Sequence, residues 1–155
     1  MKNHFLFFPM LIMLFLAIFL FGCISAPAST PSTSKITTVT FENNRIITAE
    51  IADTQESRSV GLMNRTKLEE QKGMLFIFSN SDYHSFWMKN TLIPLDIIFI
   101  DEKLKIVDII SADPCISDPC KLYTPQEKTK YVLEVNQNWT KRNRIEIGIK
   151  IKIES

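Results

Sequence analysis

The stretch "HSFWMKNTLIPLDIIFID", residues 84–101, places polar side chains beside an almost wholly apolar run. Lys89 and Asn90 come before a proline, Pro94, and Asp96 interrupts the apolar run that follows. Because proline biases the residue before it toward extended backbone, the stretch predicts two strands joined by a turn. An unpaired carboxylate inside a buried strand is costly, so we expect Lys89 to lie against Asp96 across this turn.

The flanking sequence contains further segments in which apolar and polar side chains alternate, as expected for strands with one buried face. The last of them alternates isoleucines with charged residues over residues 144–154, which predicts one long final strand. The other segments are "KITTVTF", "RIITAEIA", "GMLFIFS", "LKIVDIISA" and "KYVLEVN".

One short helix is expected at about residues 54–63. Asp53 can cap its N-terminus, and Glu56 follows three residues later, which is the spacing of a capping box. Many short strands and a single helix predict a mainly β domain, a sandwich or barrel.

The N-terminus predicts a membrane attachment. Residues 5–21 are apolar apart from a mild break at Pro9, and Gly22 and Cys23 follow. This pattern is typical of an export signal with a lipidated Cys23, or of an uncleaved signal anchor. We therefore divide the chain into an anchor segment at residues 1–23, a disordered Ser/Thr/Pro-rich linker at 24–35, and a β domain at 36–155.

Charge argues against nucleic acid as a partner. The chain has 18 basic and 17 acidic side chains, and Lys2 is the only charged residue among the first 22. The exported part is therefore formally neutral and has no polybasic patch beside the anchor. We expect it to face the outside of the cytoplasm and to meet the membrane only through its N-terminus.

The polar cluster in the opening stretch has two interpretations. It can simply hold the turn between two core strands, or it can line a binding site for a small molecule, a glycan or an envelope partner. In the second case the site consists of Trp87, Lys89, Asn90 and Asp96, with Arg58 or Arg65 contributed from the helix region. An adaptor protein with an exposed apolar patch and no deep pocket is a further possibility.

An enzyme is the alternative. Asp96 or Glu134 would act as acid or base beside Lys89 in an envelope hydrolase or lyase. His84 is the only histidine after the anchor segment, and no serine lies in a nucleophile-elbow sequence.

The sulfur-containing residues allow two further hypotheses. Cys115 and Cys120 in "DPCISDPC" are expected to form a local disulfide outside the cytoplasm, with redox or metal chemistry as the alternative. The methionines are expected to fill core gaps, so no metal or other cofactor is predicted. A copper site would instead combine His84 with thioether ligands from Met63, Met74 and Met88.

The segments "IADTQESRSVGLMNRTKL", "GMLFIF", "FWMKNTLIPLDIIFID", "ADPC" and "KYVLEVN" occur in an order that resembles the DUF192 (UPF0127) family. This resemblance covers about residues 45–150 and implies a jelly-roll-like β-sandwich behind an export signal, with no assigned activity. Two positions depart from the family pattern, Gln137-Asn138 and Gly148-Ile149, so the closing turn is expected to differ. The resemblance marks Arg58, Gly61, Met63, Arg65, Gly73, Met74, Trp87, Met88, Lys89, Asn90, Thr91, Pro94, Asp96, Cys115, Tyr123 and Glu134.

Overall fold

The structure is a computed structural model in which residues 35–154 are described. The expected anchor at residues 1–23, with its Cys23, and the linker as far as residue 34 lie outside the described residues. Within residues 35–154, neither helix is long and apolar enough to cross a membrane.

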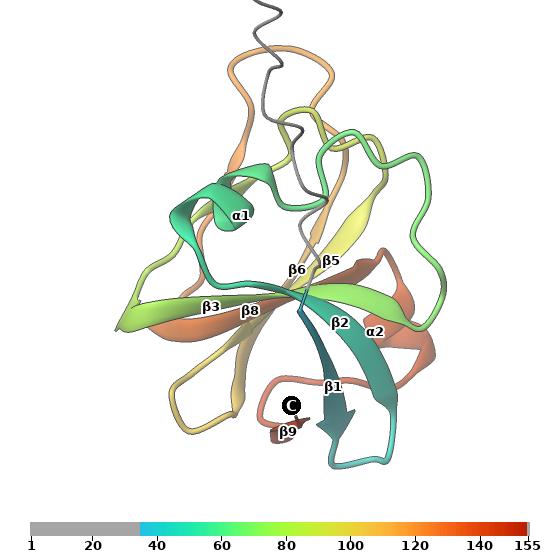
Figure 1. Cartoon of the computed structure of the whole chain (residues 1–155), viewed down its shortest axis with the longest axis vertical. Helices are drawn as coiled ribbons and strands as arrows, with labels where there is room; N and C mark the ends of the chain where they lie inside the picture. The colour runs from blue at the N-terminus through green and yellow to red at the C-terminus, as the bar shows by residue number, and fades with distance from the viewer. Residues whose placement is uncertain (1–34, 155) are drawn as a thin grey trace, which may run out of the picture. The chain divides into compact units, whose positions relative to one another are not determined.

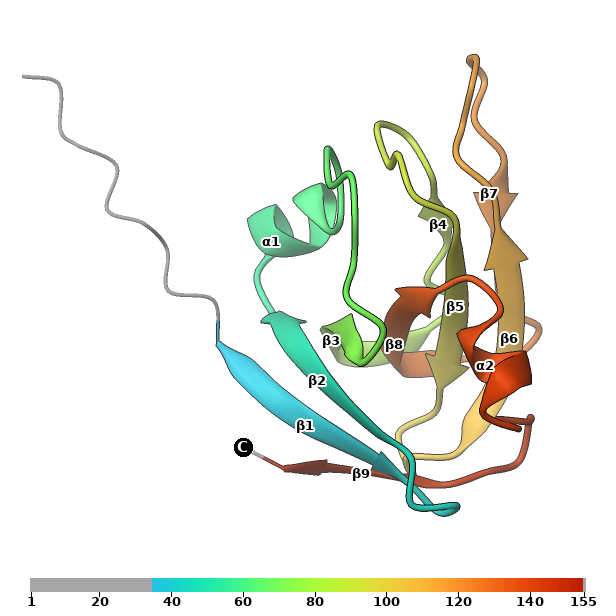
Figure 2. The same cartoon turned by 90° about the vertical axis from the view of Figure 1, so that its right-hand side faces the viewer.

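A curled seven-stranded sheet forms the centre of the domain (Figures 1 and 2). Its strand order is β6-β5-β8-β3-β2-β1-β9, and only the β2–β3 pair is parallel. A separate two-stranded ribbon pairs β4 with β7. This architecture confirms the expected mainly β fold. The elements are β1 (Ile36–Phe41), β2 (Ile46–Ala52), α1 (Gln55–Val60), β3 (Lys72–Asp82), β4 (Phe86–Trp87), β5 (Leu95–Ile100), β6 (Ile106–Ala112), β7 (Leu122–Tyr123), β8 (Thr129–Asn136), α2 (Trp139–Arg142) and β9 (Ile151–Glu154).

The two edges of the curled sheet meet. The segment that leads into β9 runs beside the start of β6, where the Gly148 amide donates to the Ile106 carbonyl at 2.8 Å and the Ile151 amide donates to the Leu104 carbonyl at 2.9 Å. These hydrogen bonds close the curl into a barrel-like form and leave less of the sheet edge exposed.

Two apolar cores lie on the two faces of the sheet. One fills the inside of the curl and includes Phe41, Leu75 and Trp139. The other lies between the opposite face and the segment with α1 and the long loops, and includes Phe76 and Met88. All six residues of β5 are buried because this strand is covered on both faces.

The helix region differs from the expectation in its cap. Thr54, not Asp53, caps α1: its Oγ1 accepts from the Ser57 amide at 3.1 Å, and Ser57 Oγ accepts from the Thr54 amide at 3.0 Å. Asp53 instead pairs with Lys35 at 2.8 Å. The helix is also shorter than expected, because Gly61 follows it with a positive φ of 49°.

The expected long final strand is wrong. Only Ile151–Glu154 is a strand, because Arg144 and Gly148 have positive φ angles of 55° and 99° that interrupt extended backbone. Ile147 consequently points into solvent, although Ile145 and Ile151 are buried. The departure at Gly148-Ile149 thus falls in the closing turn.

Asp96 does not pair with Lys89, contrary to the expectation. Its side chain is fully buried in β5, and its Oδ1 accepts from the Ser111 hydroxyl of β6 at 2.7 Å. Its Oδ2 accepts from both the amide and the hydroxyl of Thr140 in α2, at 3.1 and 2.6 Å. Asn138, at the start of α2, provides no side-chain cap. The carboxylate of Asp96 therefore caps the N-terminus of α2 in place of the Asn138 side chain.

We expect Asp96→Ala to lower the free energy of unfolding by about 3 kcal/mol or more, because the buried amide and hydroxyl donors of Thr140 lose their acceptor. Equilibrium urea unfolding, followed by tryptophan fluorescence, measures the change. Lys89→Ala is the comparison variant and should cost less than about 1 kcal/mol, since its ion pair is exposed. Equal losses in the two variants would contradict this assignment.

Candidate functional site

Three segments gather at one end of the domain, which lies at the top of Figures 1 and 2. They are the chain after α1 at residues 61–71, the loop and turn at 83–94, and the loop at 113–126. Backbone hydrogen bonds tie them together: the Asn64 amide donates to the Asn90 carbonyl at 2.8 Å, and the Cys115 amide donates to the Met88 carbonyl at 3.4 Å. We call this region the loop end.

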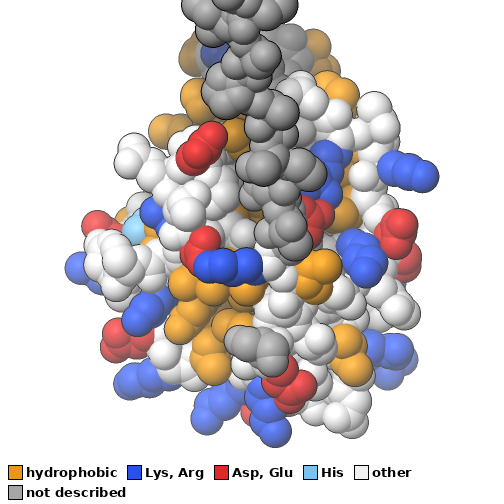
Figure 3. All heavy atoms as spheres, viewed as in Figure 1, with side chains coloured by type: hydrophobic (Ala, Val, Ile, Leu, Met, Phe, Trp, Pro, Cys, Tyr) orange, Lys and Arg blue, Asp and Glu red, His pale blue; other side chains and the backbone are white. Residues whose placement is uncertain are grey.

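The β4–β7 ribbon gives the loop end an apolar outer face. Trp87 pairs with Leu122 across the ribbon, and their exposed fractions are 47% and 62%. The next pair, Phe86 and Tyr123, turns inward and packs on the core. Figure 3 shows hydrophobic side chains at the surface at this end, and others lower on the same face among basic and acidic side chains.

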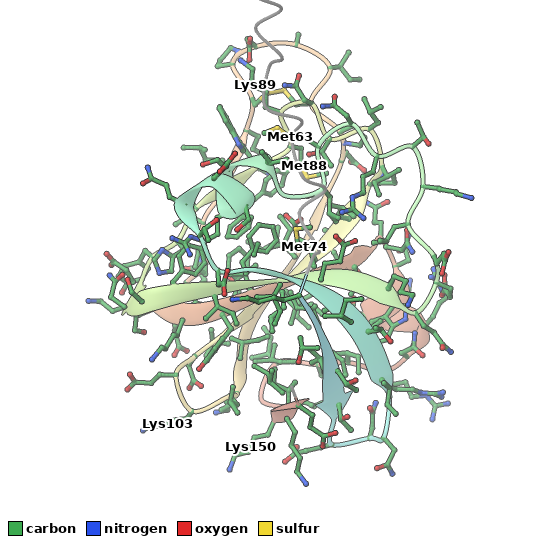
Figure 4. All side chains as sticks on the ribbon, viewed as in Figure 1. Met63, Met74, Met88, Lys89, Lys103 and Lys150 are labelled. Carbon is green, nitrogen blue, oxygen red and sulfur yellow. A yellow bond between two sulfur atoms is a disulfide. The ribbon has the colours of Figure 1, made fainter. Side chains whose placement is uncertain are left out.

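Lys89 belongs to this outer face. Its Nζ lies 5.7 Å from the centre of the Trp87 ring and 3.2 Å from a carboxylate oxygen of Asp118. Figure 4 places Lys89 at the upper end of the molecule, far from Lys103 and Lys150 at the lower end. The exposed Trp87 and Leu122, together with Lys89, form what we call the Trp87 surface.

The other expected site residues are distributed differently. The Asn90 backbone has a positive φ of 57°, as its place in the turn requires. Arg58 donates to the Ile77 carbonyl at 2.8 Å and lies 5.2 Å from the Phe78 ring centre. These contacts and the burial of Asp96 separate Arg58 and Asp96 from Trp87, Lys89 and Asn90.

Arg65 forms a bidentate ion pair with Glu50 of β2, in which Nη2 of Arg65 lies 2.8 Å from Oε2 of Glu50. The hydrogen bonds to Glu50 raise the pKa of the Arg65 guanidinium. The pair lies in a groove of about 430 Å³ between the loop after α1 and the outer face of β1 and β2. The groove is lined by Ile36, Thr48, Glu50, Arg65, Lys67, Leu68, Glu69, Lys72 and Gly73.

The acid–base residues of the enzyme alternative are separated from one another. Glu134 in β8 pairs with Met74 and Ile97, whereas Asp96 pairs with the next residue of β8, Val135. Since successive strand residues point to opposite faces, the two carboxyl groups lie on opposite sides of the sheet. Lys89 is ion-paired with neither of them.

Glu134 is nevertheless unusual. Its side chain is 5% exposed, and it forms no hydrogen bond or ion pair with any residue in the described range 35–154. Burial alone raises its pKa to about 8. The sequence offered a weak signal for this, since Glu134 interrupts an apolar strand.

The residues of the alternative copper site lie in different surroundings. Met74 and Met88 are buried in the core beneath the loops, as Figure 4 shows with Met63 above them. His84 stacks on Phe78 with ring centres 3.6 Å apart, and its Nε2 lies 3.1 Å from the Asn80 carbonyl.

The raised pKa of Glu134 predicts a pH-dependent stability. Between its ordinary value of 4.5 and about 8, the folded chain keeps a proton that the unfolded chain releases. The free energy of unfolding should therefore fall as pH rises through this window, by up to about 1.4 kcal/mol per pH unit. Urea unfolding at a series of pH values measures this slope.

Glu134→Gln should remove that part of the slope, because the variant has no proton to lose. Glu69→Gln, which changes an exposed glutamate, is the matched control and should leave the slope unchanged. If the free energy of unfolding of Glu134→Gln depends on pH as steeply as that of the parent chain, Glu134 is ionised in the folded chain. Its raised pKa would then be refuted.

Comparison with known proteins agrees with this fold. The chain is 28% identical over 107 residues to UPF0127 protein PH1112 of Pyrococcus horikoshii, covering 66% of this chain and 84% of that protein. It is 30% identical over 108 residues to UPF0127 protein PYRAB11210 of Pyrococcus abyssi, covering 66% and 83%.

A solved structure is also similar: a protein of unknown function from Novosphingobium aromaticivorans, with 32% identity and a TM-score of 0.68. The similarity covers 83% of this chain and 94% of that protein. The family model DUF192, described as "Uncharacterized ACR", matches residues 37–153, nearly the whole β domain. The chain therefore belongs to the DUF192 (UPF0127) family.

Proposed function

We propose that the chain is a membrane-tethered, extracytoplasmic binding protein whose ligand is a component of the cell envelope and rests on the Trp87 surface. The observation that carries this proposal is the half-exposed indole of Trp87, presented beside Leu122 and Lys89. Tryptophan is among the residues that contribute most to binding energy when they are covered by a partner.

The Trp87 surface is held in place by the core. Trp87 and Leu122 lie on a ribbon whose other face, Phe86 and Tyr123, packs against buried side chains. The Phe86 ring makes an edge contact with Phe76 of β3, with ring centres 4.9 Å apart. A surface fixed in this way loses little conformational entropy when a ligand binds, which favours affinity.

The make-up of the surface suits a ligand with both an apolar face and polar groups. Trp87 and Leu122 offer apolar contact, and the Lys89 and Asp118 side chains offer a donor and an acceptor at its rim. Such a mixture is typical of sites that bind small molecules or sugar rings and of the centres of protein interfaces.

The proposed location rests on the sequence and on the disulfide. The apolar residues 5–21 followed by Cys23 support an export signal or anchor. A disulfide between Cys115 and Cys120 fits a compartment outside the cytoplasm, where thiols are not kept reduced.

Photo-crosslinking in the native envelope tests the proposal. A photoreactive benzoyl-phenylalanine in place of Leu122 should give a cross-linked product, which mass spectrometry assigns to a glycan, a lipid or a protein. The same residue in place of Ile46, which is similarly exposed in β2, is the matched control and should not give that product.

Adding Trp87→Ala to the Leu122 probe should reduce the product about tenfold or more, since loss of a central aromatic contact typically costs at least 2 kcal/mol. The substituted chain should keep its free energy of unfolding within about 1 kcal/mol, because Trp87 is not a core residue. Identical products from the two probe positions, or a yield that does not respond to Trp87→Ala, would refute the proposal.

A further inference from the structure

The tip of the loop at residues 113–121 brings together two sulfur atoms and a carboxylate. A disulfide joins Cys115 to Cys120, with Cα atoms 5.6 Å apart, and Cys120 Sγ lies 3.6 Å from Asp118 Oδ1. The ligand atoms of Cys115, Asp118 and Cys120 all lie within 4.8 Å of one another. Within residues 35–154, no other group of three His, Cys, Asp or Glu side chains is close enough to hold a metal ion.

A hollow of about 250 Å³ is bordered by one of these residues, Cys115. Met88 forms part of its wall, and the Cys115 amide donates to the Met88 carbonyl, so a thioether residue borders the same space. Figure 4 shows Met88 beneath Lys89, on the core side of the loop end. The hollow is lined by Met88, Asp113, Pro114, Cys115, Ile116, Ser117, Pro119, Lys121 and Tyr123.

We propose that reduction of the Cys115–Cys120 disulfide converts this loop into a binding site for a thiophilic d¹⁰ metal ion, Zn²⁺ or Cu(I), held by the two thiolates with Asp118 or Met88 as a further ligand. A dithiol reductant that acts outside the cytoplasm supplies two electrons and two protons, so the disulfide becomes two thiols and the reductant becomes a disulfide. The ion then displaces the two thiol protons as the sulfur–metal bonds form.

The backbone spacing suits such an ion. Two thiolates bound tetrahedrally to Zn²⁺ at about 2.3 Å lie about 3.8 Å apart. Rotation of the two side chains reaches this separation from Cα atoms 5.6 Å apart without moving the backbone. Thiolate and thioether suit Cu(I), whereas thiolate with carboxylate suits Zn²⁺, so the third ligand distinguishes the two ions.

Metal binding would also change the contacts of Lys89 within the Trp87 surface. The Asp118 carboxylate is the ion-pair partner of Lys89, and the ammonium of Lys89 lies against the Trp87 ring. An ion that takes up the carboxylate releases Lys89 from Asp118 and changes the surroundings of the indole. This inference is independent of the identity of the envelope ligand.

The test is a titration of the full chain in detergent, reduced with dithiothreitol and freed of it under anaerobic conditions. Zn²⁺ and Cu(I) are titrated separately against a chromophoric chelator. The reduced chain should bind one equivalent of at least one of the two ions, and the oxidised chain should bind that ion at least about tenfold more weakly.

Cys115→Ser and Cys120→Ser should each reduce the affinity of the reduced chain to that of the oxidised chain. Asp118→Asn should weaken Zn²⁺ about tenfold or more, and Met88→Leu should do the same for Cu(I). Asp113→Asn, which changes another carboxylate at the same hollow, is the matched control and should leave both affinities unchanged. Because Asp118 is exposed, its variant should keep the fold.

Trp87 provides a second readout. The chain has two tryptophans, so Trp139→Phe leaves Trp87 as the only reporter, and its fluorescence should change on Zn²⁺ addition to the reduced chain alone. Equal affinities of the oxidised and reduced chains, or of the reduced chain and both cysteine variants, would overturn the proposed site. Unchanged affinities in both Asp118→Asn and Met88→Leu would overturn the third ligand.

Discussion

The buried carboxylate of Asp96 is the interaction on which the closed form of this domain depends. It joins three elements that are far apart in the sequence, since β5 carries Asp96, β6 carries Ser111 and α2 carries Thr140. The α2 turn positions Trp139, whose ring lies 5.4 Å from that of Phe41 in β1. One carboxylate thus fixes the turn that supplies the largest side chain of the inner core and connects the two halves of the curl.

The two faces of the central strands serve different purposes. Asp96 and Trp139 belong to the inner face, where every polar group that the carboxylate meets is a hydrogen-bond donor. Glu134 belongs to the other face, under the loops, where Met74 and Ile97 are its partners on the two neighbouring strands. The hydrogen-bonded carboxylate of Asp96 is compatible with a rigid closure, whereas burial raises the pKa of Glu134 and makes stability depend on pH close to the loop end.

The strands could be predicted from the sequence because alternation and apolar runs report local burial. The short helix could also be predicted. Its N-cap is Thr54, one residue after the predicted Asp53, and Asp53 instead forms an ion pair with Lys35. The length of the final strand could not, since a left-handed residue such as Arg144 is invisible to a pattern of alternating isoleucines. Sequence patterns report which side chains are buried, but not where a chain bends.

The contacts of the polar cluster in residues 84–101 follow only partly from its local sequence. Lys89 and Asp96 are seven residues apart, so an ion pair between them was the simplest expectation. However, a strand covered on both faces offers partners from elements far along the chain, and both carboxylate oxygens of Asp96 accept hydrogen bonds, from Ser111 and Thr140. Lys89 therefore lies against the Trp87 ring and forms its ion pair with Asp118. The stretch divides into a structural half at Asp96 and an exposed half at Trp87 and Lys89, and only the exposed half remains available for recognition.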